Sequence, residues 1–353
     1  MKMMNGLVLS GYGVLKLEMI DRPEIPEDYV EIEVSHTGIC GSDIHGFTGE
    51  NGRRFPGQVM GHESEGVISG IGPGVDSEKF PTGQRVTFNP VVIPPEQLEP
   101  FLDREQHSPE KFVIGVRPDY PAAFAEYVLV PARNVVKIDP NAIAGTGALV
   151  EPLAVAVHAV KRARLTADAS ILVAGGGPIG QSIVVALKEL GICRIIVSEP
   201  NADRRKLLET LGAVTVDPTD PGLNLAEFVR KTLGDLVHVG FDAVGVSDTL
   251  TACLEAVQLG GTVCLVGMGS PRLEVDAYAI STAERSVVGT FTYSASAFME
   301  AAEIISRTDS GVERLIGQVI SPEEAPAMFT DLAAGKGPAG KVLISFLKHS
   351  PNL

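Results

Sequence analysis

The segment ILVAGGGPIG, residues 171–180, constrains the fold of this chain more than any other part of the sequence. An apolar run of strand length ends in glycines, and an apolar segment of helix length follows at once. The same alternation continues to about residue 290, with helix-length segments such as ADRRKLLETLG between apolar strand candidates. Strands that alternate with helices predict a parallel sheet with helices on both faces.

The remainder of the chain has a different pattern. Up to about residue 140, short β-like runs such as YVEIEVSHTG and QRVTFNP are separated by glycine and proline, which predicts an irregular all-β domain. After about residue 291, a helical pattern is followed by the strand candidate KVLISFL. Since 353 residues exceed the usual size of one domain, we expect three segments, with bounds at residues 1–150, 151–290 and 291–353.

The glycine pattern is typical of a dinucleotide-binding turn. Gly175 permits a tight turn, Gly177 lets a pyrophosphate approach the backbone, and Gly180 lets helix and strand pack closely. Glu199, at the end of the next strand, can accept hydrogen bonds from a ribose and favours NAD, although Arg204 and Arg205 leave NADP open. A structural glycine turn is the alternative. The predicted nucleotide-binding residues are Gly175, Gly177, Pro178, Ile179, Gly180, Glu199 and Arg204.

Composition excludes several classes of function. The net charge of −15 repels phosphate backbones, so we expect no nucleic-acid partner. No apolar run is long enough to span a bilayer and no signal core follows the start of the chain, so we expect a cytoplasmic protein without a membrane partner. The four cysteines are widely spaced, which makes a disulfide framework improbable and leaves thiols available for chemistry.

Candidate metal ligands lie in three separate segments. Cys40 belongs to TGICGSDIHG, His62 and Glu63 to GHESEG, and Glu151 to LVEPLAVAVHA. Cysteine, histidine and carboxylate side chains bind zinc, and a catalytic zinc site takes three protein ligands and keeps one position open. Each residue taken singly has a plainer interpretation, because a lone histidine is more often structural and a lone glutamate is usually solvated.

The order of GICGSDIHG, MGHE, EPLAVAVHA and GGGPIG resembles the zinc-dependent medium-chain alcohol dehydrogenase superfamily, nearest to its sorbitol or polyol dehydrogenase and threonine dehydrogenase branch. The resemblance implies an α/β Rossmann domain, a doubly wound parallel sheet, inserted in an irregular β catalytic domain of the chaperonin-like (GroES-like) type. It implies a cytoplasmic enzyme that transfers a hydride between a nicotinamide cofactor and a secondary alcohol or ketone. A polyol or sugar-derived alcohol is the expected substrate.

Three other functions stay open beside that expectation. One is a threonine- or amino-alcohol-type dehydrogenase, and another is a metal-free quinone or enoyl reductase, which would have no use for the four candidate ligands. The third is a protein that binds nucleotide without turnover, which would need no path for a proton.

The resemblance also implies roles for single residues. Cys40 and His62 take the positions of zinc ligands, while Glu63 and Glu151 hold the two positions that supply a third ligand or a water-holding carboxylate. Ser42 and His45 match a proton relay, and Asp43 matches a carboxylate that orients the ligand histidine. The plainer alternatives are that Ser42 caps a helix, Asp43 pairs with a lysine or arginine, and His45 is solvated.

Three surface features complete the sequence predictions. Residues 94–110 contain no cysteine, so we expect a solvated lobe, no structural zinc site and one zinc per chain. Arg53 and Arg54 either meet an anionic substrate or, more often for such residues, belong to a solvated or subunit-contacting loop. The segment at residues 261–290 is expected at a sheet edge that is buried in a homodimer or homotetramer.

Overall fold

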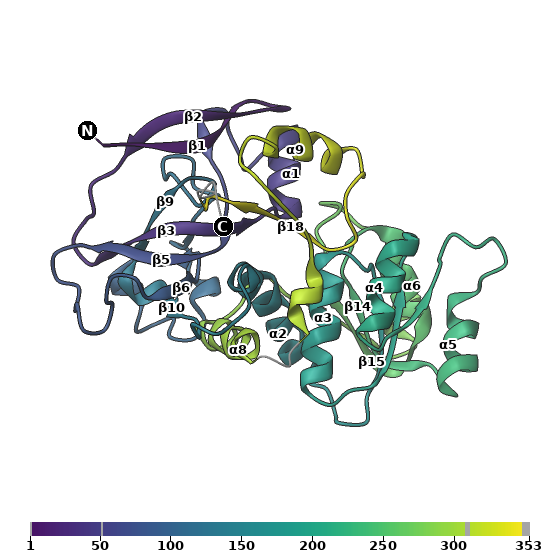
Figure 1. Cartoon of the computed structure of the whole chain (residues 1–353). Coiled ribbons are helices and arrows are strands. Elements are labelled where there is room, and N and C mark those ends of the chain that lie inside the picture. The colour runs from purple at the N-terminus through teal and green to yellow at the C-terminus, as the bar shows by residue number, and fades with distance from the viewer. Residues whose placement is uncertain (1, 51, 308–310, 348–353) are drawn as a thin grey trace. The chain divides into compact units, whose positions relative to one another are not determined.

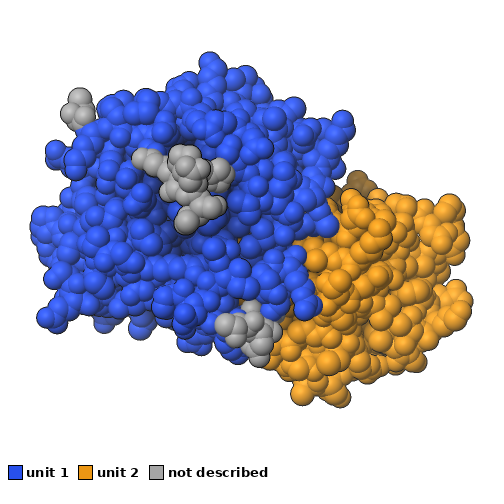
Figure 2. Space-filling view, viewed as in Figure 1, with its two compact units in different colours: residues 1–151, 294–353 blue, residues 152–293 orange. Residues whose placement is uncertain are grey.

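The computed structural model describes residues 2–50, 52–307 and 311–347. The chain divides into two compact units, residues 1–151 with 294–353 (unit 1) and residues 152–293 (unit 2), which Figure 2 distinguishes by colour. Helix α2 (Val150–Ala163) begins in unit 1 and continues into unit 2. Among the described residues, no helix is both long enough and apolar enough to cross a membrane.

Unit 2 contains a six-stranded parallel sheet with the strand order β13-β12-β11-β14-β15-β16. This is the doubly wound order, in which the direction of winding reverses between β11 and β14. The strands are β11 (Ser170–Ala174), β12 (Arg194–Ser198), β13 (Val214–Val216), β14 (Val237–Asp242), β15 (Val257–Leu265) and β16 (Ser286–Gly289). The helices are α3 (Pro178–Glu189), α4 (Ala202–Thr210), α5 (Leu225–Leu233), α6 (Ser247–Ala256) and α7 (Ala277–Ser281).

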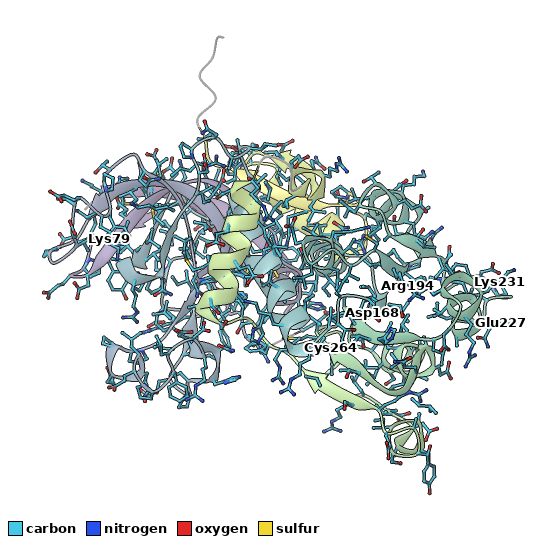
Figure 3. All side chains as sticks on the ribbon, turned by 90° about the horizontal axis from the view of Figure 1, so that it is seen from below. Lys79, Asp168, Arg194, Glu227, Lys231 and Cys264 are labelled. Carbon is cyan, nitrogen blue, oxygen red and sulfur yellow. The ribbon has the colours of Figure 1, made fainter. Side chains whose placement is uncertain are left out.

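The sequence pattern of unit 2 explains why these elements form. β11 is buried along its whole length, as a strand covered on both faces must be. Helix α5 is amphipathic: Val229 is buried, whereas Glu227 and Lys231 are exposed and point outward in Figure 3. The apolar strand candidates between residues 170 and 290 are strands of this one sheet, so the predicted parallel α/β fold is confirmed.

Unit 1 is mainly β-structure, and Figure 1 shows its two larger sheets. In the described part of the chain, one sheet has the order β2-β1-β4 and another has the order β10-β6-β5-β3-β18-β17, with β9 also paired to β3. The strands are β1 (Lys2–Gly11), β2 (Val14–Arg22), β3 (Tyr29–Gly38), β4 (Gln58–Val59), β5 (Glu63–Ile71), β6 (Arg85–Phe88), β7 (Val91–Val92), β8 (Phe112–Val113), β9 (Tyr127–Pro131), β10 (Val135–Lys137), β17 (Ile316–Ile320) and β18 (Lys341–Ser345).

The helices that accompany these strands among the described residues of unit 1, besides the start of α2, are α1 (Gly41–Thr48), α8 (Ala295–Ser306) and α9 (Ala325–Ala333). Helices α1 and α9 lie side by side, with the rings of Phe47 and Phe329 at a centroid distance of 5.5 Å (Figure 1). The C-terminal strand β18 pairs with β3, so the end of the chain belongs to the same sheet as its beginning. The irregular β domain expected from the resemblance is confirmed, and its larger sheet includes the C-terminal strand β18.

The lobe at residues 94–110 differs in one respect from the solvated lobe that we expected. Most of its side chains are exposed, but two carboxylates accept hydrogen bonds at the start of α8. Asp103 Oδ1 accepts from the backbone N of Ser296 at 2.7 Å, and Glu105 Oε2 accepts from that of Ala295 at 3.3 Å. The lobe is therefore attached to α8, because the first N–H groups of a helix need acceptors from outside the helix.

Candidate active site

Cys40, His62 and Glu63 come together in unit 1, and their ligand atoms all lie within 4.8 Å of one another. The register of the sheet explains this, because Gly38 at the end of β3 pairs with Glu63 at the start of β5. Gly38 also makes room: a Cβ at that position would lie 2.4 Å from the Oε2 atom of Glu63. Cys40 follows Gly38 by two residues and caps the start of α1, which brings its sulfur to the same place.

Lys341 is the nearest cation to this group, and the sequence analysis did not identify it. Its Nζ lies 2.6 Å from Oε2 and 2.8 Å from Oε1 of Glu63, and also donates to the carbonyl oxygen of Ile39 at 3.3 Å. Burial would lower the pKa of Lys341, but the carboxylate of Glu63 raises it above its usual value, so the lysine is charged. The sequence feature that could have identified it is a lysine as the first residue of the apolar strand β18, because a buried lysine needs a charged partner.

Asp43 lies fully buried between two partners. Its Oδ1 is 3.1 Å from an Nη atom of Arg54 and 3.6 Å from Nδ1 of His62, and its Oδ2 accepts a 3.3 Å hydrogen bond from the backbone N of Cys40. The sequence left open whether Asp43 pairs with an arginine or lies beside the histidine, and in the structure it does both. Arg54 is only 1% exposed, so its expected place in a solvated or substrate-facing loop is wrong.

The electrostatics of His62 show an excess of negative charge in the site. Burial by itself lowers the pKa of His62, but Asp43, then Cys40, and more weakly Glu151 raise it to about 10 in the absence of a metal. Nδ1 of His62 has no hydrogen-bond partner within the described part of the chain. The site therefore favours a positive charge at the position of the imidazole or beside it.

The donor set fits a zinc ion. Sulfur, imidazole nitrogen and carboxylate oxygen are its ordinary protein ligands, and three of them leave a position for a substrate. Metal binding deprotonates a cysteine, and the anions around the site then exceed the cations by two, which matches a divalent ion. The anions are Cys40, Asp43, Glu63 and Glu151, and the cations are Arg54 and Lys341.

Glu151 lies close to the site without joining the group of three. It is the second residue of α2 and is 9% exposed. Its charge raises the pKa values of both His62 and Lys341. Of the two glutamates that the sequence left undecided, Glu63 is therefore the one whose carboxylate lies within 4.8 Å of the other two donors.

Ser42 and His45 both lie on α1, three residues apart and thus on neighbouring positions of one helix face. Ser42 is half-buried, and its Oγ lies 3.5 Å from an Nη atom of Arg54. The side chain of His45 is 51% exposed, and its Nδ1 lies 3.1 Å from a carboxylate oxygen of Glu50. An inner hydroxyl and an outer imidazole on one face fit the two ends of a proton path to solvent.

In unit 2, the predicted glycines lie between β11 and α3. Gly175 has φ +95°, which is accessible to glycine at little cost, and a Cβ at Gly180 would lie 1.9 Å from the carbonyl oxygen of Gly175. Gly177 caps α3 and is followed by Pro178 in the first turn and then by Ile179. A Cβ at Gly177 would meet only Arg204 Nη1, at 3.8 Å, so a ligand can approach the backbone there.

Glu199 immediately follows β12 and is 3% exposed. Its Oε2 accepts from the backbone N of Gly176 at 2.6 Å, and its Oε1 accepts from that of Asn201 at 2.8 Å. The carboxylate is therefore held against the glycine turn. Arg205 donates to the carbonyl oxygen of Glu199 and pairs with Asp217, so of the two arginines only Arg204 reaches the turn.

The other cysteines are structurally unlike Cys40, and none of the four forms a disulfide. Cys264 lies on β15 (Figure 3), and burial raises its pKa to about 12. Burial also raises the pKa of Cys253. A thiol with a raised pKa is a poor nucleophile and metal ligand. Among the described groups of His, Cys, Asp and Glu side chains, the one with the geometry for a metal is that of Cys40, His62 and Glu63.

Comparisons with known proteins give a consistent result. Residues 178–307 match the model of the zinc-binding dehydrogenase family, and residues 26–140 match that of the alcohol dehydrogenase GroES-like domain. D-xylulose reductase A of Aspergillus niger is 32% identical over 340 residues, covering 94% of each chain.

Two solved structures share the fold along nearly the whole chain. The 2R,3R-butanediol dehydrogenase of Bacillus subtilis is 27% identical, with a TM-score of 0.86 and coverage of 97% of this chain and 99% of the other. A protein from Sinorhizobium meliloti 1021 whose structure contains NADP is 29% identical, with a TM-score of 0.85 and coverage of 98% and 100%.

Proposed function

Because this chain belongs to the zinc-dependent medium-chain alcohol dehydrogenase superfamily and is an NAD(P)-dependent oxidoreductase of that type, we propose that its substrate is a polyol or a sugar-derived secondary alcohol, or the matching ketone. The observation that carries the proposal is the group formed by Cys40, His62 and Glu63. The D-xylulose reductase and the butanediol dehydrogenase support it, since both are named after compounds that carry hydroxyl or keto groups on neighbouring carbons.

We assign the zinc ligands to Cys40, His62 and Glu63, and give Glu151 the task of holding a water or a substrate hydroxyl. A zinc ion held there would supply Lewis-acid chemistry to the oxygen of the alcohol, and a bound nicotinamide would supply the hydride acceptor. Lys341 neutralises part of the charge on Glu63 and keeps its carboxylate in place. Asp43 faces the imidazole of His62 and orients that ring.

Ser42 and His45 carry the proton of the alcohol toward water. The Ser42 hydroxyl is the inner group, and the exposed His45 releases the proton to solvent, with Glu50 beside it. General acid–base groups of this kind raise rates by about 100-fold or more. A protein that only binds a nucleotide would need neither residue.

The decisive experiment is a substrate screen with protein of known zinc content. Polyols, secondary alcohols, amino alcohols and their ketones are tested for the absorbance change of the reduced cofactor, with Glu63→Gln and Glu151→Gln in parallel. We expect polyols to be turned over best and zinc to be lost from Glu63→Gln alone. Turnover of quinones or enones by zinc-free protein would instead support the metal-free reductase, and a preference for amino alcohols would support the threonine-type alternative.

We further propose that the cofactor is NAD. The Glu199 carboxylate, buried against the glycine turn, can accept from a ribose 2′-hydroxyl and repels a 2′-phosphate. Arg204 lies at the same turn and is the residue through which NADP would be accommodated. Catalytic efficiencies measured with both cofactors test this, and a clear preference for NADP would overturn the role given to Glu199.

We also propose that the protein is a homodimer or homotetramer built on the free edge of the unit 2 sheet. β16 is one of the two edge strands, and apolar side chains on β15, α7 and β16 are exposed: Leu259 (76%), Tyr278 (75%) and Val287 (39%). Apolar strand edges tend to aggregate unless they are covered. Light scattering at micromolar concentration should give a stable oligomer, and a stable monomer would contradict the proposal.

A further inference from the structure

Arg54 is the largest of the fully buried side chains in unit 1, at 1% exposure, although its neighbour Arg53 is exposed. A guanidinium is almost never fully buried without a partner. Arg54 follows α1 and precedes β4, in a part of the chain without regular secondary structure. Two adjacent arginines with opposite exposure indicate that the second one has a specific task.

The guanidinium of Arg54 contacts two side chains of the candidate active site. Its Nη2 atom lies 3.1 Å from Oδ1 of Asp43 and 3.5 Å from Oγ of Ser42. The same Oδ1 atom is 3.6 Å from Nδ1 of His62. Arg54 therefore contacts the carboxylate that faces one proposed zinc ligand, and the hydroxyl that begins the proposed proton path.

Gly46 provides an independent observation. It lies inside α1, where glycine is less favourable than alanine. A Cβ at this position would lie 2.2 Å from Cγ and 2.8 Å from Cβ of Arg54. The arginine stem thus crosses the helix face at the one residue that leaves room for it, on the same face as Ser42 and Asp43.

We propose that Arg54 is a positioning residue of the metal centre. Its guanidinium holds the Asp43 carboxylate in the orientation that supports the ring of His62, and it holds the Ser42 hydroxyl toward the site. The inference rests on the proposed function, because it requires a zinc ion at Cys40 and His62. Arg54 touches neither substrate nor cofactor in this scheme and acts through Asp43 and Ser42, so its effect appears first in the affinity for metal.

The primary test compares Arg54→Lys with Arg53→Lys, a matched change at the exposed neighbour. Zinc affinity is measured by competition with a chelator, at a temperature where circular dichroism shows each variant folded. Lysine keeps the positive charge but lacks the planar guanidinium group that can contact two oxygens at once. We therefore expect zinc affinity to fall about 10-fold in Arg54→Lys, the smallest loss usual for mutations of groups that support metal ligands. Zinc affinity should stay unchanged in Arg53→Lys. Equal affinity in both variants would overturn the proposal.

Gly46→Ala tests the same contact without altering any charge. Alanine is the better helix former, so an uninvolved Gly46 would make this variant more stable with unchanged zinc binding. We expect zinc affinity to fall as in Arg54→Lys, because the added methyl group displaces the arginine stem. Cobalt substitution adds a spectroscopic readout: the thiolate-to-cobalt band should change in Gly46→Ala and Arg54→Lys, and an unaltered band in both would contradict the proposal.

The double variant Asp43→Asn with Arg54→Met removes both charges, so it avoids leaving one ion buried alone. We expect it to fold and to bind zinc more weakly than wild type, since His62 loses its carboxylate. Wild-type zinc affinity in this variant would overturn the inference. A wild-type protein that holds no zinc at Cys40 and His62 would instead refute the proposed function itself, and the inference with it.

Discussion

The two units place their functional residues in different ways. In unit 2, the candidate nucleotide-binding residues lie between positions 175 and 204, on one strand–helix–strand segment and the helix that follows. In unit 1, the residues around the candidate metal site come from positions as far apart as Cys40 and Lys341. A short segment largely determines its own geometry, whereas a dispersed site exists only once strand pairing has brought its parts together. Variants that affect one unit and spare the other test this difference.

The largest effect is expected from Cys40→Ser. Loss of the thiolate should remove most of the zinc and the turnover together, because serine is a weak zinc ligand. NAD affinity should stay close to that of wild type, since unit 2 has its own core and glycine turn. Elemental analysis and a cofactor titration measure both, with Cys193→Ser, an exposed thiol of unit 2, as the control. A variant that kept zinc and turnover would make Cys40 an ordinary thiol.

Lys341→Met should make the stability of unit 1 depend more strongly on zinc than it does in wild type. Removing one partner of a buried ion pair typically costs about 3–5 kcal/mol, because the other charge stays buried alone. Bound zinc would neutralise Glu63 and offset much of that loss, so the unfolding temperature should fall more in the presence of a chelator. Lys336→Met, at an exposed position, is the control. An equal fall with and without chelator would argue against Glu63 as a zinc ligand.

His45→Ala should lower turnover by about 100-fold and alter the pH dependence of kcat, while the zinc content stays that of wild type. The residue is exposed and does not belong to the ligand group, so its loss leaves the metal in place. Glu50→Gln, which changes only the partner of His45, should have a smaller effect. An unchanged pH profile in His45→Ala would identify it as a solvated surface histidine.

Glu65→Gln should reduce stability mainly near neutral pH. Burial alone would raise the pKa of Glu65, but His36, Arg85 and the backbone N–H of Gly145 lower it below its usual value. Because the pKa of Glu65 is lower in the folded state than in the unfolded state, the ionised carboxylate stabilises the fold at pH values above its unfolded pKa. This stabilisation is lost as the pH falls through the folded pKa.

Charge-assisted hydrogen bonds of this kind are worth about 2 kcal/mol each, so urea unfolding at pH 7 should separate Glu65→Gln from wild type. At acidic pH, the free energies of unfolding of Glu65→Gln and wild type should become equal. Glu33→Gln, exposed on β3, serves as the control. A constant difference across the pH range would show that packing, rather than charge, explains the loss.

The smallest effect is expected in the lobe at residues 94–110. Asp103→Ala removes an acceptor at the start of α8 and should cost about 1 kcal/mol, the usual value of a helix cap, without changing zinc content or turnover. Glu99→Ala, at an exposed position of the same lobe, should cost less. Metal analysis of wild type belongs beside this test, since two zinc ions per chain would contradict the expectation of a single site.

Several features could be predicted from the sequence because they depend on neighbouring residues. The six strands of unit 2 and the turn at Gly175 follow from apolar runs, helix-length spacing and glycines that lie next to one another. The candidate ligands Cys40, His62, Glu63 and Glu151 follow from the chemistry of these residue types and from the resemblance of short motifs. The hydrophobic periodicity of the sequence could not predict that these side chains lie close together in space.

Only the tertiary structure shows which groups surround Arg54, Lys341, Glu63 and Glu151. Arg54 and Arg53 are the same residue type in the same loop, and burial against Gly46 together with the contact to Asp43 distinguishes Arg54. Lys341 meets Glu63 because β18 and β5 both pair with β3, a register that no local segment encodes. Local chemistry determined which side chains were available to this protein, and strand pairing decided which of them meet, because burial and charge pairing depend on contacts between distant parts of the chain.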